Sequence, residues 1–210
     1  MKMCRLYILA ICAALACACM PKKPQAIFLS PDFTEPMKVA VLPFENETTD
    51  LDAGGLYREL FATALLEKGY KVIPTAEVDE KLREMGITDG GQLGAFKNAD
   101  LQKKLDAEAL IFGNLKEAKY LTVGIKKQKK ATGYAALYRK DAKLWEDEKS
   151  YSKSEYSLNP VSAIQKQLAG KLAETALGKY SGHPLYQFIE QAVYLVQETM
   201  PGTRVEKSGW

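Results

Sequence analysis

The stretch Lys38 to Phe44, KVAVLPF, is the first strand that the sequence predicts. Residues Val39 to Leu42 are apolar without alternation, which is typical of a central strand covered on both faces. Leucine and aromatic residues at helical spacing from about 56 to 65 predict a helix, which Gly69 ends. Tyr70 to Ile73 then predicts a second strand, so the chain runs from strand to helix to strand.

A second unit follows in the same order. Short helices are predicted at Ala76 to Met85 and at Asp100 to Leu105, with a loop and one helical turn at 88–99 between them. The run Ala109 to Gly113, ALIFG, predicts a third buried strand. Strands that alternate with helices imply parallel pairing and right-handed crossovers.

The pattern changes after residue 113. Tyr120 to Ile125 and Thr132 to Tyr138 predict a hairpin around a lysine-rich turn at 126–130, and Lys143 to Ser150 predicts one more short strand. Asn159-Pro160 then opens a long helix. The expected fold class is α/β, bordering on α+β: a mixed sheet with a parallel βαβαβ unit, then antiparallel strands, and two C-terminal helices.

The second C-terminal helix, predicted at Leu185 to Thr199, is apolar around most of its girth. The exposed surface of a monomer rarely carries a helix of this kind. The segment 183–200 is therefore expected either to pack on the domain or to form an interface for self-association or partner binding. The residues expected at that interface are Leu185, Ile189, Val193 and Val196.

The chain begins with a leader that is typical of secretion. Lys2 and Arg5 precede an apolar run from Leu6 to Ala18, which is too short for a bilayer core that needs ~20 residues. Small residues at the end of the run lead directly into cysteine, whereas a plain secretory signal ends in small residues alone. An ordinary signal peptide or an apolar N-terminal anchor is the alternative interpretation.

Two overlapping stretches resemble the bacterial lipobox, in which a small residue precedes the cysteine that receives the lipid. They are Ala14-Leu15-Ala16-Cys17 and Ala16-Cys17-Ala18-Cys19. The resemblance implies cleavage before the cysteine and acylation with chains such as palmitate, which together anchor a protein stably. Cys19 is slightly preferred because the polar residues begin just after it, and Cys17 remains the alternative.

The leader divides the chain into a signal peptide at 1–18 and a mature protein. A Pro-rich tether is expected at 19–36, although Ile27, Phe28, Leu29 and Phe33 indicate that part of it lies on the body. The α/β periplasmic domain is expected at 37–180, the apolar helix at 183–200 and a tail at 201–210.

The composition limits the chemistry that the body can perform. All four cysteines lie in the leader, so the body is expected to fold without disulfides. The net charge of +3 includes Lys2 and Arg5, so the mature chain lacks the basic field of a nucleic-acid-binding protein. His183 is the only histidine and lacks evident orienting partners, which favours a structural or solvated role over catalysis. The protein is therefore not expected to be an enzyme, and we expect no metal site and no cofactor in it.

Two charged segments have plain interpretations. The lysines at 126–130 serve solubility, or alternatively contact anionic lipid headgroups or another acidic envelope surface. The loop after the first strand carries Glu45, Glu47, Asp50 and Asp52, which would repel an anion.

Several segments together resemble known families. Val39 to Phe44, followed by Asn46 and Thr48, resembles the opening strand of envelope proteins related to the TolB amino-terminal domain, LpoB and CsgG. Further segments resemble the GNA-type lipoproteins, a bacterial family of unknown function: Gly69 to Pro74, Val78 to Glu80, Gly86 to Thr88, Leu105 to Gly113 and Asp141 to Glu146. The resemblance implies a TolB-like α/β body on a lipid anchor, often dimeric. It supplies no established catalytic residues.

The sequence thus predicts a lipoprotein anchored in the outer membrane and facing the periplasm. Met20, or Ala18 for the other register, follows the cysteine instead of the Asp that signals inner-membrane retention in this class of leader. The expected role is a non-enzymatic accessory or scaffold subunit of an envelope assembly, as a homodimer or with an envelope protein partner. The alternative is a ligand-binding or secretion-channel-associated component related to CsgG. A channel subunit needs long alternating membrane strands, and the strands expected here are short and rich in lysine, so this alternative ranks lower.

Overall fold

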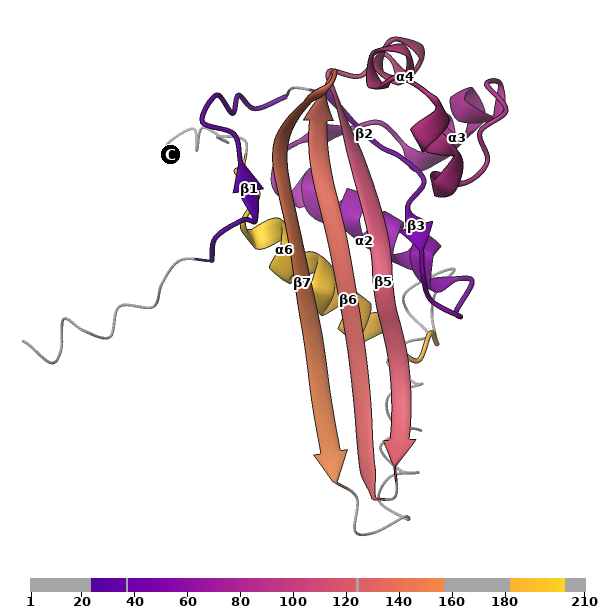
Figure 1. Cartoon of the computed structure of the whole chain (residues 1–210), viewed down its shortest axis with the longest axis vertical. Helices are drawn as coiled ribbons and strands as arrows, with labels where there is room; N and C mark the ends of the chain where they lie inside the picture. Colours follow the sequence, from indigo (N-terminus) through magenta and orange to yellow (C-terminus); the bar gives the residue numbers. More distant parts are fainter. Residues whose placement is uncertain (1–23, 37, 124, 157–181, 203–210) are drawn as a thin grey trace, which may run out of the picture.

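A seven-stranded mixed sheet organises the computed structural model, which describes residues 24–36, 38–123, 125–156 and 182–202 (Figure 1). Its strands are β1 (Phe28–Leu29), β2 (Lys38–Val41), β3 (Glu45–Asn46), β4 (Lys71–Val72), β5 (Ala109–Val123), β6 (Lys126–Arg139) and β7 (Ala142–Tyr156). Its helices are α2 (Ala53–Glu67), α3 (Thr75–Arg83), the 3-10 helix η1 (Gly90–Ala95), α4 (Asn98–Leu105) and α6 (Tyr186–Glu198). Cys17, Cys19, the helix expected after Asn159 and the end of the tail lie outside the described residues.

The order of the strands is β1-β7-β6-β5-β2-β4, and β3 pairs with β5 beyond the end of β2. Strand β2 is parallel to both β4 and β5. From β2 the chain passes through β3 and then α2 before it reaches β4. The antiparallel pairs β5–β6 and β6–β7 complete the sheet. The predicted fold class, a mixed sheet in which a parallel unit precedes antiparallel strands, is therefore confirmed.

The three central strands are longer than the sequence predicted. Strand β5 runs through Ala109–Val123 without a break, where two strands at 109–113 and 120–125 were expected. The residues between them continue the pairing with β6, with one register shift between Leu115 and Glu117. The lysines at 126–130 belong to β6 and pair with β5 on one side and β7 on the other. Their assignment to a hairpin tip was therefore wrong, because Lys126 already pairs with Val123 of β5.

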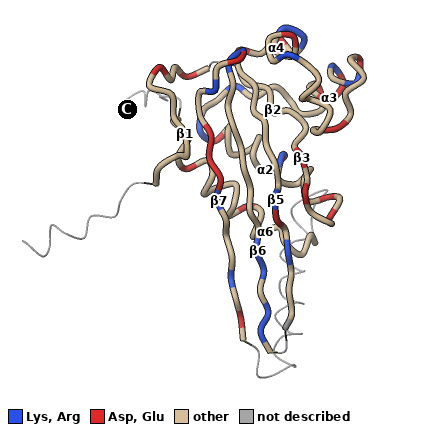
Figure 2. Tube along the Cα trace, in the orientation of Figure 1, with Lys and Arg blue, Asp and Glu red and all other residues tan. Residues whose placement is uncertain are grey.

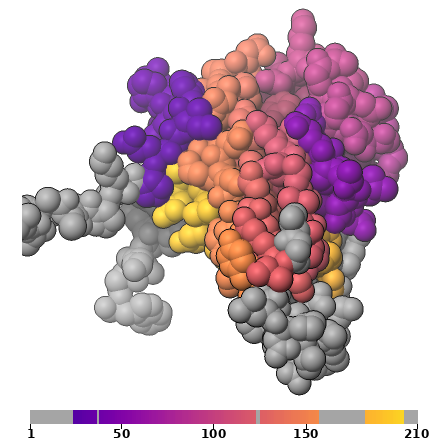
Figure 3. Space-filling model, turned by 60° about the horizontal axis from the view of Figure 1, so that its bottom comes forward, coloured from indigo at the N-terminus to yellow at the C-terminus, as the bar shows by residue number. Residues whose placement is uncertain are grey.

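Two short strands were not predicted. Strand β1 pairs with the outer edge of β7, with Phe28 opposite Glu146 and Leu29 opposite Trp145, so this part of the expected tether lies on the body (Figure 3). Strand β3 pairs in parallel with β5, with Glu45 opposite Asn114. Both strands have only two residues, which is too short for a recognisable alternation.

The sheet separates two apolar layers. Helices α2 and α6 cover one face of β5, β6 and β7, where they enclose the larger core cluster. Helices α3 and α4, with η1, cover the opposite face around β2, the start of β5 and a part of β6. The rest of that opposite face of β5, β6 and β7 is called the open face below, and it carries mainly polar side chains.

Helix α6 packs inside the molecule. Its expected interface residues Leu185, Ile189, Val193 and Val196 are all at most 4% exposed. The structure thus has the first of the two predicted arrangements, packing on the domain, and the interface expected on these four side chains is not at the surface. The reason is that the sheet offers a long apolar face, which α2 alone does not cover.

Polar contacts hold the end of α6 in place. Gln197 donates from Nε2 to the carbonyl of Phe61 on α2 over 2.8 Å, and Lys68 donates to the carbonyls of Gln197 and Met200. A cation at the carbonyl end of a helix also interacts favourably with the helix dipole. Within the described ranges, no helix combines the length and the apolar content needed to cross a bilayer.

The chain that follows β2 is fixed by a buried arginine and a glycine. Arg58 is 7% exposed, donates from Nε and Nη2 to the carbonyl of Val41, and pairs with Asp79 on α3 at 2.8 Å. Further on, Gly90 presses against the backbone that leads into β3. A β-carbon on Gly90 would lie 2.7 Å from the carbonyl oxygen of Pro43 and 2.8 Å from the amide nitrogen of Glu45.

We predict that Ile189→Ala lowers the free energy of unfolding by about 2–5 kcal/mol, because it leaves a cavity between α6 and the sheet. Tyr194→Ala, on the same helix but at a position 62% exposed, should change it by no more than ~0.5 kcal/mol. Urea denaturation followed by circular dichroism measures both. Equal effects of the two substitutions would contradict the packing of α6.

We predict opposite effects for two glycines of η1. Gly90→Ala should destabilise the protein by about 1–3 kcal/mol, since backbone atoms surround the added methyl group. Gly94→Ala should stabilise it by ~0.4–1 kcal/mol, because nothing lies within 4 Å of the added β-carbon and the unfolded chain loses freedom. The same denaturation measurement compares them, and a neutral Gly90→Ala would refute the close approach of η1 to β3.

Candidate functional site

Four polar residues form a row across the open face of the sheet. The strand register places Glu45 of β3 opposite Asn114 of β5, Asn114 opposite Tyr134 of β6, and Tyr134 opposite Glu148 of β7. Residues directly opposite one another in a sheet project from the same face. The register alone therefore gathers side chains from four strands.

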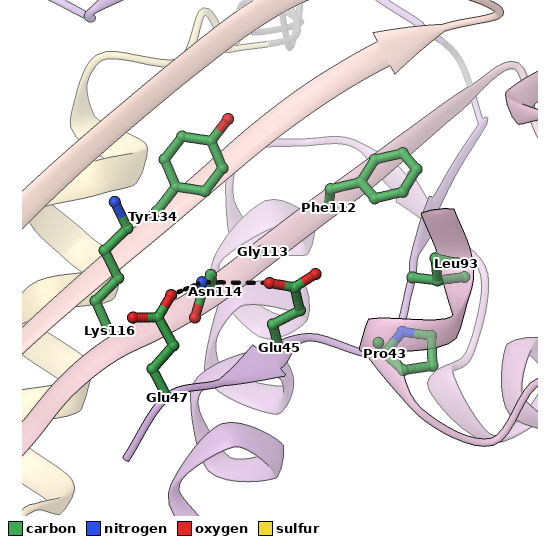
Figure 4. Close-up of a pocket in the computed structure, with 10 residues that line it drawn as sticks. Pro43, Glu45, Glu47, Leu93, Phe112, Gly113, Asn114, Lys116 and Tyr134 are labelled. Carbon is green, nitrogen blue, oxygen red and sulfur yellow. Dashed lines mark hydrogen bonds between the residues drawn. The ribbon is translucent and has the colours of Figure 1, made fainter. Parts of the chain in front are cut away.

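A cavity of about 330 Å³ lies over one end of this row (Figure 4). Apolar residues form one wall, and charged and polar side chains from β3, β5 and β6 form the rest. The lining residues are Pro43, Glu45, Glu47, Gly90, Leu93, Phe112, Gly113, Asn114, Lys116 and Tyr134. A volume of this size is at the small end of the range for ligand pockets.

Two carboxylates stand at the β3 side of the cavity. Glu45 and Glu47 are two residues apart along an extended chain, so their side chains project on the same side. The amide nitrogen Nδ2 of Asn114 donates to Oε1 of Glu47 over 2.5 Å and to Oε2 of Glu45 over 3.4 Å (Figure 4). This shared donor offsets part of the repulsion between the two negative charges.

The other half of the same amide has no partner. Asn114 is 9% exposed, and its oxygen Oδ1 is buried and accepts no hydrogen bond from the residues that the structure describes. A buried acceptor without a partner costs ~1–3 kcal/mol. Buried polar groups are rarely left in this state, so this oxygen calls for a partner such as water, an ion or a ligand.

The opposite side of the cavity carries a cation that is held in place. The ammonium group of Lys116 lies 2.5 Å from Oε2 of Glu148 and 5.5 Å from the ring centroid of Tyr134. The hydroxyl of Tyr134 donates to Oε2 of Glu146 over 2.9 Å, and Glu146 also pairs with Lys143. These contacts link β5, β6 and β7 across the open face.

The two of these residues that line the cavity, Lys116 and Tyr134, stay protonated near neutral pH. The hydrogen bond to Glu148 raises the pKa of Lys116 above its usual value. Burial, and then the hydrogen bond to Glu146, raises the pKa of the Tyr134 phenol. A general base or a nucleophilic amine near neutral pH needs the opposite shifts. Neither Lys116 nor Tyr134 is therefore suited to act as a general base or a nucleophile near neutral pH.

His183 contacts the segment that leads into α6 and the loop before α2. Nδ1 of His183 accepts a hydrogen bond from the backbone N–H of Leu185 over 3.2 Å, next to the start of α6. Its Nε2 lies 3.0 Å from Oδ2 of Asp50, in the loop before α2. No group of three or more His, Cys, Asp or Glu residues in the described part of the chain is placed to hold a metal ion.

Lysines gather at the start of β6 (Figure 2). Lys129 donates to the carbonyl of Pro184 over 3.0 Å and lies over the ring of Phe188, so it seals the start of α6. Lys130 projects from the open face and pairs with Glu117. At least these two lysines therefore have specific partners within the molecule.

Asn114, Lys116 and Tyr134 were not recognised as site residues from the sequence. Asn114 directly follows the apolar run of β5, and a polar residue on such a strand is a signal that was available. Its partners Glu45 and Glu47 are 69 and 67 residues away in the chain. Only the parallel pairing of β3 with β5 brings them together.

Comparison with known proteins finds one sequence relative and several solved structures that resemble this chain. The lipoprotein NMB1124/NMB1162 of Neisseria meningitidis serogroup B (strain ATCC BAA-335 / MC58) is 26% identical over 184 residues, which are 83% of this chain and 84% of the relative. The crystal structure of lipoprotein GNA1162 from Neisseria meningitidis is 24% identical, with a TM-score of 0.52 over 64% of this chain and 99% of its own. PelC from Paraburkholderia phytofirmans, a dodecamer, has a TM-score of 0.48 and 14% identity over 83% of this chain and 96% of its own.

The family match covers most of the chain. The sequence model of the family described as "Putative lipoprotein GNA1162-like" matches residues 32–181, from the segment before β2 to the segment before α6. The resemblance to GNA-type lipoproteins found in the sequence is thereby confirmed. The chain belongs to the GNA1162-like family of lipoproteins.

Proposed function

We propose that this protein is anchored in the outer membrane by lipid on Cys19 or Cys17, faces the periplasm, and serves as a non-enzymatic accessory subunit of an envelope assembly. Membership of a lipoprotein family and the lipobox-like leader support the anchor. The absence of Asp after either cysteine supports the outer membrane as its destination.

The position of β1 supports a body that is held close to the membrane. Phe28 is nine residues after Cys19, and an extended chain of that length reaches about 30 Å. The pairing of β1 with β7 therefore fixes Phe28 on the body, within that distance of the cysteine. Three apolar side chains at this edge, Ile27, Phe28 and Leu29, are 61%, 38% and 47% exposed and lie next to the tether.

The observation that supports the non-enzymatic role is the protonation of Lys116 and Tyr134 in the pocket. Lys116 is held charged by Glu148 and Tyr134 is held neutral, so neither supplies a base near neutral pH. Both side chains instead present fixed hydrogen-bonding groups on the open face.

The pocket also favours the ligand-binding alternative. A cavity with a buried, unpartnered amide oxygen and two carboxylates is suited to a small polar ligand. The length of the strands no longer argues against a channel-associated role. The lysines at 126, 127, 129 and 130 still argue against that role. Because neighbouring positions project from opposite faces, they place positive charge on both faces of β6, whereas a membrane strand needs one apolar face.

We predict that cells labelled with radioactive palmitate incorporate the label into this protein, and that Cys19→Ser abolishes the labelling. Loss of the acceptor thiol removes the site of acylation. Immunoprecipitation followed by autoradiography measures the label, and density-gradient separation of the membranes tests the location.

Cys17→Ser is the matched control, and it should keep the label if Cys19 is the acceptor. The reverse pattern would assign the anchor to Cys17. An unlabelled wild-type protein would refute the lipid anchor, and label that travels with the inner membrane would refute the proposed location.

A further inference from the structure

We infer that the pocket between β3 and β5 binds a primary ammonium group carried on a small aliphatic or polar body. The inference rests on the proposed binding role of the pocket but not on the lipid anchor. Its starting point is the combination of Glu45 and Glu47, which are exposed at the rim, with the buried amide of Asn114 beneath them.

The geometry of the acceptors matches an ammonium group. A primary ammonium has three N–H donors and no acceptor. Glu45 and Glu47 present oxygens to one point, since a single nitrogen of Asn114 reaches both of them. A ligand nitrogen placed between the two carboxylates, over the amide of Asn114, would satisfy both carboxylates with charge-assisted hydrogen bonds, which are stronger than those from a neutral amide.

The amide of Asn114 supplies the third acceptor by turning over. Its oxygen Oδ1 has no hydrogen-bond partner, so no contact on that side fixes the orientation of the amide. A half turn would bring Oδ1 towards Glu45 and Glu47, where three oxygens would then surround the ammonium. The turn gives up the hydrogen bonds from Nδ2 to Glu45 and Glu47, which the ammonium group of the ligand replaces, and one amide group is unpartnered before and after.

The remaining walls explain why the ligand should be an amine with a small body. Pro43, Leu93 and Phe112 offer apolar surface next to the carboxylates, which suits a short aliphatic segment. The one cation of the lining, Lys116, forms its ion pair with Glu148 and lies over Tyr134, so it offsets the charge of Glu47 only at longer range. An anionic ligand would meet two carboxylates at the rim and is disfavoured.

The test is a nuclear magnetic resonance titration of the full ¹⁵N-labelled chain in non-ionic micelles with three probes of similar size. The probes are propylammonium, propan-1-ol and propionate. We expect only propylammonium to shift, in a saturable way, the side-chain NH₂ signal of Asn114 and the backbone signals of Glu45 and Glu47. Raised salt should weaken the binding, because the two carboxylates are exposed.

Variants separate this site from general attraction of cations. Glu45→Gln and Glu47→Gln should each weaken propylammonium binding about tenfold, because each removes one charge-assisted hydrogen bond. Asp141→Asn, which removes an exposed carboxylate at the turn between β6 and β7, should leave the binding unchanged. All three positions are exposed, so the rest of the spectrum should stay that of the folded protein.

Three outcomes would overturn the inference: no saturable shift with propylammonium, equal binding of propan-1-ol, or equal weakening by Asp141→Asn. Failure here would leave the lipid anchor intact, since palmitate labelling tests that separately. A protein that takes up no palmitate but binds propylammonium would refute the lipid anchor and support the ammonium site.

Discussion

Backbone pairing along β5 is the constraint on which the rest of the structure depends. This strand is parallel to β2 and β3 on one side and antiparallel to β6 on the other, so it joins the two halves of the sheet. Side chains alternate between the two faces of a strand. Ile111 and Leu115 therefore enter the core beneath α2 and α6, whereas Asn114 projects into the polar row on the open face.

The length of β5, β6 and β7 explains why the chain returns with α6. Three strands of 14 or 15 residues present more apolar surface than the single helix α2 covers. Helix α6 completes the layer, and a buried polar chain ties its end to β7. Nε1 of Trp145 donates to Oγ1 of Thr199 over 3.2 Å, and Thr199 donates to the fully buried Asp147 over 2.7 Å. The helix thus belongs to the core although it comes last in the chain.

Much of the fold was predictable because its first half is local. The positions of β2, α2, β4, α3 and α4, and the parallel order of the strands, follow from apolar spacing and from helix-ending glycines. The continuity of β5 was missed because Gly113 and Asn114 interrupt its apolar run, although their backbone continues the ladder. The candidate site was missed for a different reason. Its members come from strands far apart in sequence, and a shift of one residue in register would send each side chain to the other face.

The sequence by itself determined the family and the class of fold, and it predicts a leader with two candidate cysteines, since these depend on short patterns that are read in order along the chain. Only the tertiary structure decided that Ile189 and Val193 are core residues, because an apolar helix has the same sequence whether it meets its own sheet or a partner. Only the structure placed Glu45 and Glu47 against Asn114, because cross-strand register, which the sequence of either strand leaves open, fixes which side chains meet.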